Sequence, residues 1–204
     1  MLNTIGFLGC GNMGGAIARA VCKATDPQNV WLANRTAAKA EALAAELGCN
    51  TTINDEVAGR CDLIFLAVKP QMMEELLAPL RFTLAERPSA SCCAAWRRTV
   101  HCPHSGDGGR GLPGDPHHAQ YPASVGEGMI QYCSSNVTAE EEEAFRKIMA
   151  PAGRLDAVPE NLIDAASCVS GCGPAWVYQF IEALADVAHV RLSHGNNDFL
   201  QIFL

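Results

Sequence analysis

A glycine-rich turn, Gly9-Cys10-Gly11-Asn12-Met13-Gly14, constrains the fold of this chain more than any other stretch of its sequence. It follows an apolar run, Thr4–Gly9, that is typical of a strand, and it opens Asn12–Lys23, where apolar residues recur at helical spacing. In such a unit the first glycine makes the tight turn, the second lets the backbone approach a pyrophosphate, and the third lets helix and strand pack closely. The turn therefore predicts a dinucleotide site with the phosphates on the helix N-terminus. The alternative is a glycine-rich turn without a ligand.

The rest of the chain repeats this alternation of strand and helix. Further strands are expected at Val30–Ala33, Thr51–Ile53, Asp62–Val68, Glu127–Tyr132 and Arg154–Val158, and further helices at Thr36–Leu47, Pro70–Leu77, Thr138–Met149, Glu160–Cys168 and Pro174–Val187. Asp62–Val68 is apolar along nearly its whole length, as expected of a parallel strand that is buried on both faces. The order of elements predicts the α/β class, with a Rossmann-type doubly wound sheet.

The end of the second strand bears on which dinucleotide is bound. An NAD site usually carries a carboxylate there for the ribose 2′-hydroxyl, but this chain has Asn34, Arg35 and Thr36. These side chains offer hydrogen-bond donors to a 2′-phosphate, which favours NADP (NADPH), with NAD still possible. The alternative for Arg35 is an ordinary solvated residue at the start of a helix.

A second group of candidate cofactor contacts, Ala67-Val68-Lys69-Pro70, follows the most apolar strand. Ligands of open α/β sheets bind at the carboxyl ends of the strands, so we expect the backbone here to contact the cofactor. For the side chain of Lys69, a cofactor contact and a surface lysine that caps the strand are equally good interpretations.

Charge and hydropathy exclude several classes of partner. The chain has 204 residues, with 15 Lys and Arg against 22 Asp and Glu and a net charge of −7, which disfavours nucleic acid. No apolar run approaches the roughly 18 residues of a membrane span, and Met1–Gly11 lacks the basic start of a signal peptide. We therefore expect a cytoplasmic protein that acts on a small-molecule substrate, with its ten cysteines reduced.

The segment Ser89–Pro122 departs from the pattern, because its only Val, Leu, Ile or Met residues are Val100 and Leu112. We expect it to be irregular, with no strand or amphipathic helix. It also concentrates thiols and imidazoles, at Cys92, Cys93, Cys102, His101, His104, His117 and His118. A zinc site is the alternative explanation, but the cluster lacks a Cys-x-x-Cys pair, so we expect no metal.

Four stretches of the chain resemble the pyrroline-5-carboxylate reductase family. They are Ile5–Gly14, Ala67–Gln71, Val125–Gly128 and Ser170-Gly171-Cys172-Gly173-Pro174-Ala175, of which the last is the most specific. Asn54 matches a family asparagine near the cofactor ribose, and Glu160 begins a stretch that is similar to the helix leading to the family's active site. The resemblance makes Glu160 and Ser170 candidate substrate contacts and leaves the catalytic residue unknown. The alternative for Ser170 is that it caps a helix. Cys168 and Cys172 lie one helical turn apart among glycines, and we expect them to be closely packed residues.

The resemblance implies NADPH-dependent reduction of the imine carbon of 1-pyrroline-5-carboxylate to give L-proline. It also implies a dinucleotide-binding domain at residues 1–158, irregular at 89–121, and the start of an all-helical dimerisation domain at residues 159–204. The family forms homodimers or larger assemblies through that domain and completes its site with a Ser-Pro-Gly-Gly-Thr-Thr segment that this chain lacks. We therefore expect a truncated domain, doubtful dimerisation and impaired or lost activity.

The family would carry Met-Pro-Asn-Thr-Pro just before Ala123, where this chain has His118–Pro122. Suitable codons for Pro116–Pro122, read one base later, encode Arg-Ile-Met-Pro-Asn-Thr. We therefore hypothesise that residues 89–121, and residues 189–204 with them, are translated out of frame. The alternatives are the inactive product of a frameshifted gene, a nucleotide-binding remnant, and another NADP-linked oxidoreductase such as a coenzyme F420-dependent one.

Overall fold

The computed structural model describes residues 2–87, 91–94, 111–115, 122–134 and 137–193. In these residues the strands are β1 (Ile5–Leu8), β2 (Val30–Ala33), β3 (Asn50–Thr51), β4 (Leu63–Leu66), β5 (Ser91–Ala94), β6 (Gly111–Asp115), β7 (Gly128–Tyr132) and β8 (Gly153–Ala157). They form one sheet in the order β3-β2-β1-β4-β5-β6-β7-β8. Neighbouring strands are parallel except β6 and β7, which are antiparallel.

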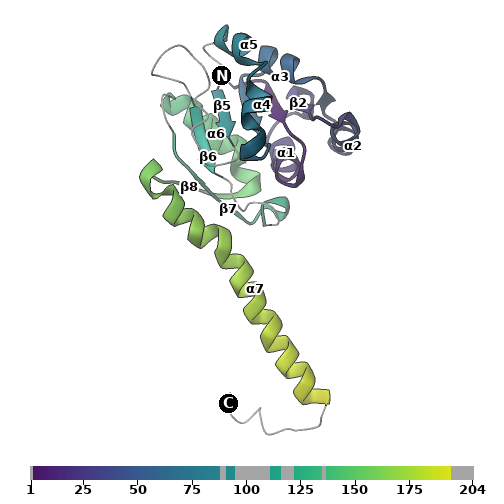
Figure 1. The fold of residues 1–204 in the computed structure, drawn as a ribbon, viewed down its shortest axis with the longest axis vertical. Coiled ribbons are helices and arrows are strands. Elements are labelled where there is room, and N and C mark those ends of the chain that lie inside the picture. The colour runs from purple at the N-terminus through teal and green to yellow at the C-terminus, as the bar shows by residue number, and fades with distance from the viewer. Residues whose placement is uncertain (1, 88–90, 95–110, 116–121, 135–136, 194–204) are drawn as a thin grey trace.

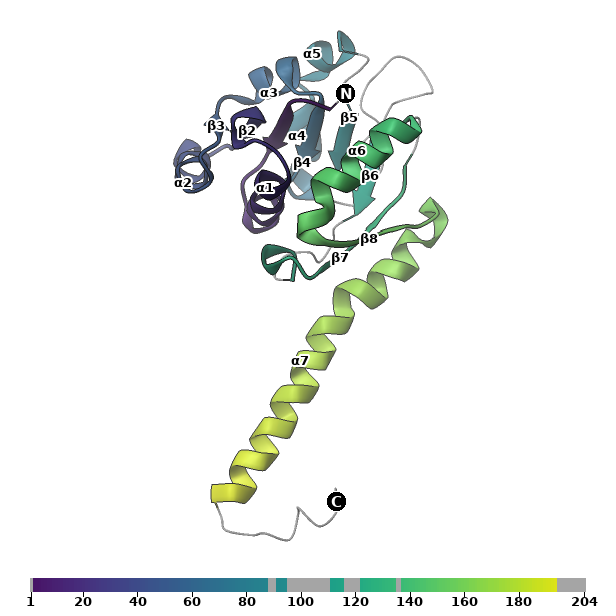
Figure 2. The ribbon, with the colours of Figure 1, turned by 180° about the vertical axis from the view of Figure 1, so that it is seen from behind.

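Helices cover both faces of this sheet (Figures 1 and 2). The α-helices are α1 (Asn12–Ala24), α2 (Ala37–Leu47), α3 (Asn54–Arg60), α4 (Met73–Leu77), α5 (Arg81–Ala85), α6 (Ala139–Met149) and α7 (Ile163–Ser193). Short 3-10 turns are η1 (Pro27–Asn29), η2 (Pro70–Met72), η3 (Pro122–Val125), η4 (Ala150–Ala152) and η5 (Glu160–Leu162). The predicted α/β class with a doubly wound sheet is confirmed.

Alternate residues of the central strands enter two separate cores. In β4, Leu63 and Phe65 pack under α1, α2 and α6, whereas Ile64 and Leu66 pack under α3, α4 and α5. The ring of Phe65 stacks on that of Phe7 with centroids 4.7 Å apart. Since every side chain of β4 is buried, the continuous apolar run of this strand is explained by cover on both faces.

Two helix ends have the structure that their local sequence favours, and a third does not. Gly48 ends α2 with a positive φ of 69°, a conformation that glycine adopts without strain. Thr138 and Glu141 have the sequence spacing of a capping box, and they form one at the start of α6. Thr36 occupies the N-cap position of α2, but its side chain makes no capping hydrogen bond there.

The prediction that no strand forms between Ser89 and Pro122 was wrong at two places. β5 pairs with β4 from Ser91 to Ala94, and β6 pairs with β5 although it contains Pro113. The physical reason is that a sheet is joined through backbone groups, so the neighbouring strands decide whether a segment without apolar alternation is paired. The other residues of 89–121 lie outside the described part of the structure. So do the side chains of the Cys and His residues that were considered as a zinc site.

The two helices expected around Ser170–Pro174 are one continuous helix, α7, with Pro174 inside it. Proline disfavours a helical conformation in the preceding residue partly through a clash with that residue's Cβ, and Gly173 has none. Ser170 is therefore inside a helix and does not cap one. The helix also runs to Ser193, beyond the expected loss of pattern at His189.

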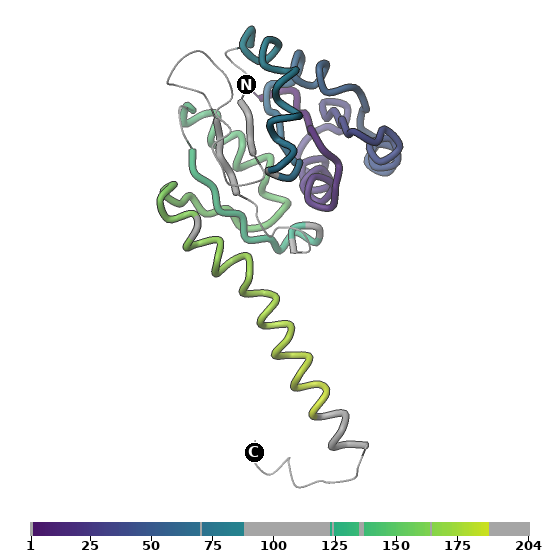
Figure 3. The backbone as a smooth tube through the Cα atoms, viewed as in Figure 1, coloured from purple at the N-terminus to yellow at the C-terminus, as the bar shows by residue number. Residues whose placement is uncertain are grey.

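Helix α7 projects far beyond the body of the molecule (Figures 1 and 3). At about 1.5 Å per residue, its 31 residues span roughly 46 Å. Its first turns contact β7, where the Ser170 hydroxyl donates to Gln131 Oε1 at 2.9 Å. Within the described residues, no helix combines the length and the apolar character needed to cross a membrane.

Candidate functional site

A cleft of about 490 Å³ opens at the carboxyl ends of β1, β2 and β4. Three chain segments surround it: the glycine turn before α1, the connection from β2 into α2, and the connection from β4 into α4. Its lining residues are Gly9, Gly11, Asn34, Arg35, Thr36, Lys39, Asn54, Ala67, Val68, Lys69, Met72, Glu75 and Leu76. The residues that the sequence singled out at three distant points therefore meet in one place.

The glycine turn has the geometry that a bound pyrophosphate needs. Gly9 has φ +109°, and a Cβ on it would lie 2.6 Å from the Ala67 carbonyl oxygen. A Cβ on Gly14 would lie 2.2 Å from the Gly9 carbonyl oxygen, so this glycine is required for packing. A Cβ on Gly11 would meet no described atom within 4 Å. The backbone at Gly11 thus faces open space at the N-terminus of α1, where a phosphate group is stabilised.

The other residues of the turn support this loop from behind and do not line the cleft. Cys10 is buried and its Sγ lies 3.6 Å from the Ala33 carbonyl oxygen. Met13 is a core residue, and Asn12 is exposed at the first position of α1. Burial raises the pKa of the Cys10 thiol to about 11, so this thiol stays protonated at neutral pH.

Asn34 organises the loops around the cleft. Its Oδ1 accepts a hydrogen bond from the Cys10 backbone N–H at 3.0 Å, and its Nδ2 donates to the Thr36 carbonyl oxygen at 3.0 Å. Both ends of the amide are therefore engaged by the protein. The sequence-based interpretation of Asn34 as a donor to a phosphate missed this role, because it depends on a contact across 24 residues.

The wall formed by α2 is basic. Arg35 precedes the helix and Lys39 lies in its first turn, four positions later, so both reach the same side of the cleft. Lys39 was missed in the sequence, although its spacing from Arg35 was the signal that could have found it. Together with the N-terminus of α2, these two cations suit a second phosphate group.

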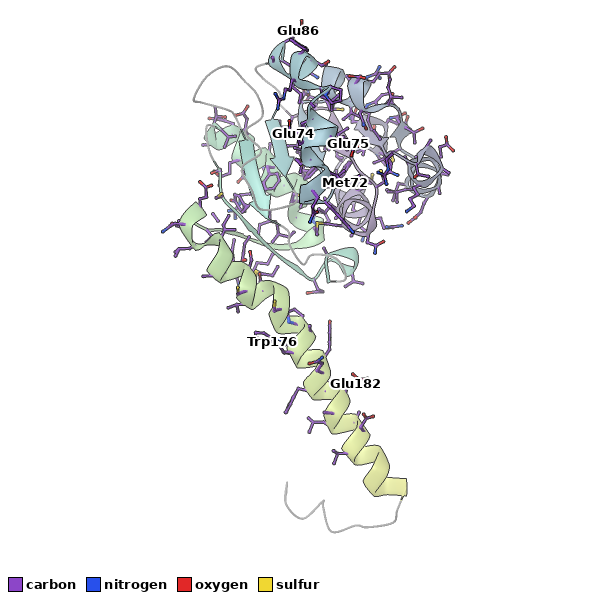
Figure 4. All side chains as sticks on the ribbon, in the orientation of Figure 1. Met72, Glu74, Glu75, Glu86, Trp176 and Glu182 are labelled. Carbon is purple, nitrogen blue, oxygen red and sulfur yellow. The ribbon has the colours of Figure 1, made fainter. Side chains whose placement is uncertain are left out.

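The opposite wall is mixed in character. Ala67, Val68 and Lys69 continue from β4, and Met72, Glu75 and Leu76 follow on η2 and α4, where Figure 4 labels Met72 and Glu75. Val68, Met72 and Leu76 provide an apolar surface suited to a flat aromatic ring. Pro70 begins η2, directly after Lys69. Asn54, the first residue of α3, also borders an adjoining hollow of about 340 Å³.

The two candidate substrate residues lie away from this cleft. Ser170 hydrogen-bonds to Gln131, and Gln131 pairs with Asp115 at the end of β6. Asp115 lies two residues beyond Pro113, the partner of the last residue of β5, so Ser170 is at the carboxyl edge of the parallel strands. Glu160 is exposed in η5. The structure thus brings Ser170 to the ligand-binding edge of the sheet, but leaves Glu160 on the surface.

The described cysteines and other possible metal ligands form no second functional site. No group of three or more described His, Cys, Asp or Glu side chains could hold a metal ion. Cys168 and Cys172 are exposed free thiols, and a Cβ on Gly173 would meet no described atom within 4 Å. Within one chain the two cysteines are therefore not closely packed against other elements, because α7 projects from the body at this point (Figure 1).

The sheet order, the glycine turn and the basic cleft are those of a dinucleotide-binding α/β protein. Comparison with known proteins shows to which family of dinucleotide-binding proteins the chain is similar. A family model described as NADP oxidoreductase, coenzyme F420-dependent, matches residues 4–93. A second, described as pyrroline-5-carboxylate reductase dimerisation, matches residues 160–192.

Relatives match over most of the chain. The pyrroline-5-carboxylate reductase of Methanosarcina acetivorans is 31% identical over 188 residues, which are 90% of this chain and 69% of that protein. That of Escherichia coli K12 is 32% identical over 196 residues, covering 92% and 71%. The chain belongs to the pyrroline-5-carboxylate reductase family.

Solved structures agree with this assignment. The pyrroline carboxylate reductase of Plasmodium falciparum, solved with NADP bound, is 29% identical with a TM-score of 0.78, covering 94% of this chain and 71% of that one. The Coxiella burnetii enzyme is 26% identical with a TM-score of 0.82, covering 93% and 71%. An imine reductase from Myxococcus stipitatus, in complex with NAD+, is 16% identical with a TM-score of 0.64, covers 96% and 67%, and shares the fold.

Proposed function

We propose that this chain binds NADPH in the cleft and that its reaction is the reduction of 1-pyrroline-5-carboxylate to L-proline. The observation that carries the proposal is the open backbone at Gly11 beside the cations Arg35 and Lys39, within one cleft. NADP bound to the Plasmodium falciparum relative supports the choice of cofactor. NADH remains a weaker alternative ligand, because the second strand ends without a carboxylate.

The proposed cofactor contacts are those expected from the sequence, with Lys39 added. They are Gly9, Gly11, Asn34, Arg35, Thr36, Lys39, Asn54, Ala67, Val68, Lys69 and Pro70, together with the backbone of Cys10, Asn12, Met13 and Gly14. Bound NADPH supplies a hydride to the imine carbon of the substrate, and a proton completes the amine. The chain's own part is to place the pyrophosphate at Gly11, to hold a 2′-phosphate between Arg35 and Lys39, and to exclude water. Glu160 and Ser170 are the proposed substrate contacts.

The proposed domain limits are residues 1–158 for the dinucleotide-binding part and 159–204 for the helical part. In support, the members of both core clusters precede residue 159. The helical part carries large exposed side chains, among them Trp176, Phe180 and Leu184. A second copy of the chain is the proposed cover for this surface, in keeping with the dimerisation model that matches it. We place the protein in the cytoplasm.

We further propose that turnover by this chain is weak or absent. β6 contains two glycines besides Pro113, and proline lacks the N–H that a strand with two neighbours uses. The sequence departs from the family in residues 116–121, which follow this strand in the chain. A reading-frame change in residues 89–121 and 189–204 would explain the departure, and the sequence of the source DNA tests it.

Calorimetric titration with NADPH, with NADH as the control, followed by an assay of 1-pyrroline-5-carboxylate reduction, tests these proposals separately. Tighter binding of NADPH than of NADH, with little proline formed, is the expected result. Rapid turnover would contradict the impairment and leave the reaction in place. Folded protein that binds neither nucleotide would overturn the proposed function.

A further inference from the structure

Glu75, on α4, is the only carboxylate among the described residues that line the cleft. It lies three residues after Met72 and directly before Leu76, and these half-buried apolar residues line the same wall. The side chain of Glu75 is exposed. A carboxylate repels the phosphate groups of a nucleotide, so Glu75 is suited to a different part of the ligand.

The carboxylate of Glu75 is available to a ligand. The neighbouring Glu74 accepts a hydrogen bond from Arg81 Nη2 at 2.8 Å and is not among the described lining residues; Figure 4 labels both glutamates. No described side chain donates a hydrogen bond to Glu75 or forms an ion pair with it, and this includes Lys69 on the same wall. Glu74 therefore helps to hold α4 against α5, whereas both carboxylate oxygens of Glu75 are open.

The proposed NADPH site determines which part of the cofactor reaches Glu75, and the inference that follows rests on that proposal. The 2′-phosphate of NADPH is attached to the ribose that carries the adenine. With this phosphate between Arg35 and Lys39, the base is one sugar away, at the same end of the cleft. Met72 and Leu76 offer an apolar surface for a flat ring, so the adenine would pack against the wall that carries Glu75.

We propose that Glu75 accepts a hydrogen bond from the exocyclic amine of the adenine, and that it selects adenine dinucleotides over those with hypoxanthine. Adenine carries this amine, a donor, where hypoxanthine carries a carbonyl oxygen, an acceptor. An ionised carboxylate offers acceptors only, so it binds the amine and repels the carbonyl oxygen. A site that hydrogen-bonds one group of its ligand rejects an analogue without that group, because its own polar group then stays unpaired.

Calorimetric titration of the whole chain with NADPH and with deamino-NADPH, in which hypoxanthine replaces adenine, tests the proposal. We expect the parent chain to bind NADPH about tenfold more tightly than deamino-NADPH. In E75Q the amide can donate as well as accept, so the two dissociation constants should come within about twofold of each other, chiefly through tighter binding of deamino-NADPH. A side chain that only shaped the wall would not move this ratio, because glutamine and glutamate have the same shape.

E74Q is the matched control, because it removes the same charge from the same helix at a residue outside the described lining of the cleft. Its ratio of dissociation constants should stay at the parental value. E41Q tests another place for the base, since Glu41 lines the adjoining hollow of about 340 Å³. All three glutamates are exposed, so each variant should melt close to the parent, which shows that it is folded.

The possible failures are distinguishable. Equal affinity of the parent chain for the two dinucleotides would refute the base contact and leave the proposed NADPH site in place. An unchanged ratio in E75Q would refute the role of Glu75, and a ratio that changes in E41Q instead would place the base in the hollow. Folded parent protein that binds neither dinucleotide would overturn the proposed function itself.

Discussion

The side chain of Asn34 accepts a hydrogen bond from the backbone N–H of Cys10 at 3.0 Å, and so links the glycine turn to the start of α2. Replacing Asn34 with Ala would leave that N–H without its partner, which costs about 1–3 kcal/mol. We expect N34A to bind NADPH about tenfold more weakly, as measured by calorimetry. N3A is the control, because only the backbone of this exposed residue makes a hydrogen bond, to Asp62. Equal affinity of N34A and N3A would contradict the role of Asn34.

Substitutions of Gly11 and Gly14 are predicted to affect different properties, namely NADPH binding for Gly11 and stability for Gly14. In G14A the new methyl group collides with the Gly9 carbonyl oxygen, and we expect a loss of about 2 kcal/mol in the free energy of unfolding. In G11A the methyl group enters open space at an N-cap with φ −74°. The loss of a glycine cap costs about 0.5–1 kcal/mol, and the lower conformational entropy of the unfolded chain offsets it by a similar amount. G11A should therefore melt like the parent protein but lose NADPH binding. Urea unfolding and calorimetry on both variants check this, and NADPH binding by G11A at parental affinity would show that the phosphates lie elsewhere.

Arg35 and Lys39 are predicted to select the phosphorylated dinucleotide. A charged hydrogen bond contributes about 1.5–3 kcal/mol, so R35A and K39A should each weaken NADPH binding by about tenfold or more. Binding of NADH, which lacks the 2′-phosphate, should change little. K23A, at the other end of α1, serves as the control. The measurement is the ratio of the two dissociation constants, and an unchanged ratio in both variants would exclude this selection.

The exposed side of α7 is predicted to drive self-association. Trp176 is 65% exposed, and Figure 4 shows it on the projecting helix together with Glu182. W176E should weaken the assembly strongly, since it places a charge in an apolar contact, whereas E182A should not. Sedimentation velocity over a range of concentrations measures the change. A parent chain that remains monomeric at every concentration would contradict the prediction.

Two buried thiols predict a loss of stability at high pH. Burial raises the folded-state pKa of Cys10 from 9.0 to about 11 and that of Cys61 from 9.0 to about 12. Because the unfolded chain releases these protons first, their contribution is fully present below pH 9 and is lost as the pH rises toward the folded-state values. Urea unfolding at pH 8 and pH 10 should show the fall, and C61A should show a smaller one. An equal fall in C61A would assign it to other groups.

The sequence predicted those parts of the fold in which the type of side chain depends on burial or on a contact within a few residues. β4 is apolar because it is covered on both faces, and the capping box of α6 lies within four residues. β5 and β6 could not be predicted, because their pairing depends on neighbouring strands. The continuity of α7 through Pro174 was also not predicted. It is possible because Gly173, which precedes the proline, has no Cβ that would clash with the proline ring.

The candidate site divides in the same way. The sequence placed Gly9, Gly11 and Arg35 in the candidate site from the glycine motif and from the position after the second strand, and all three line the cleft. The roles of two residues were not predicted. To place Lys39 in the cleft, one must know which face of α2 borders it. The hydrogen bond between Asn34 and Cys10 forms only because the sheet brings the ends of two strands together.

The separation of α7 from both cores bears on the order of events during synthesis. The described residues of the two core clusters precede α7, and among the described side chains of that helix only that of Ile163 is buried, so the packing of the clusters depends little on α7. Domains fold as units during translation, the N-terminal ones first. We therefore expect the nascent chain to form its cleft while α7 is still inside the ribosome, before the helix can meet a second copy.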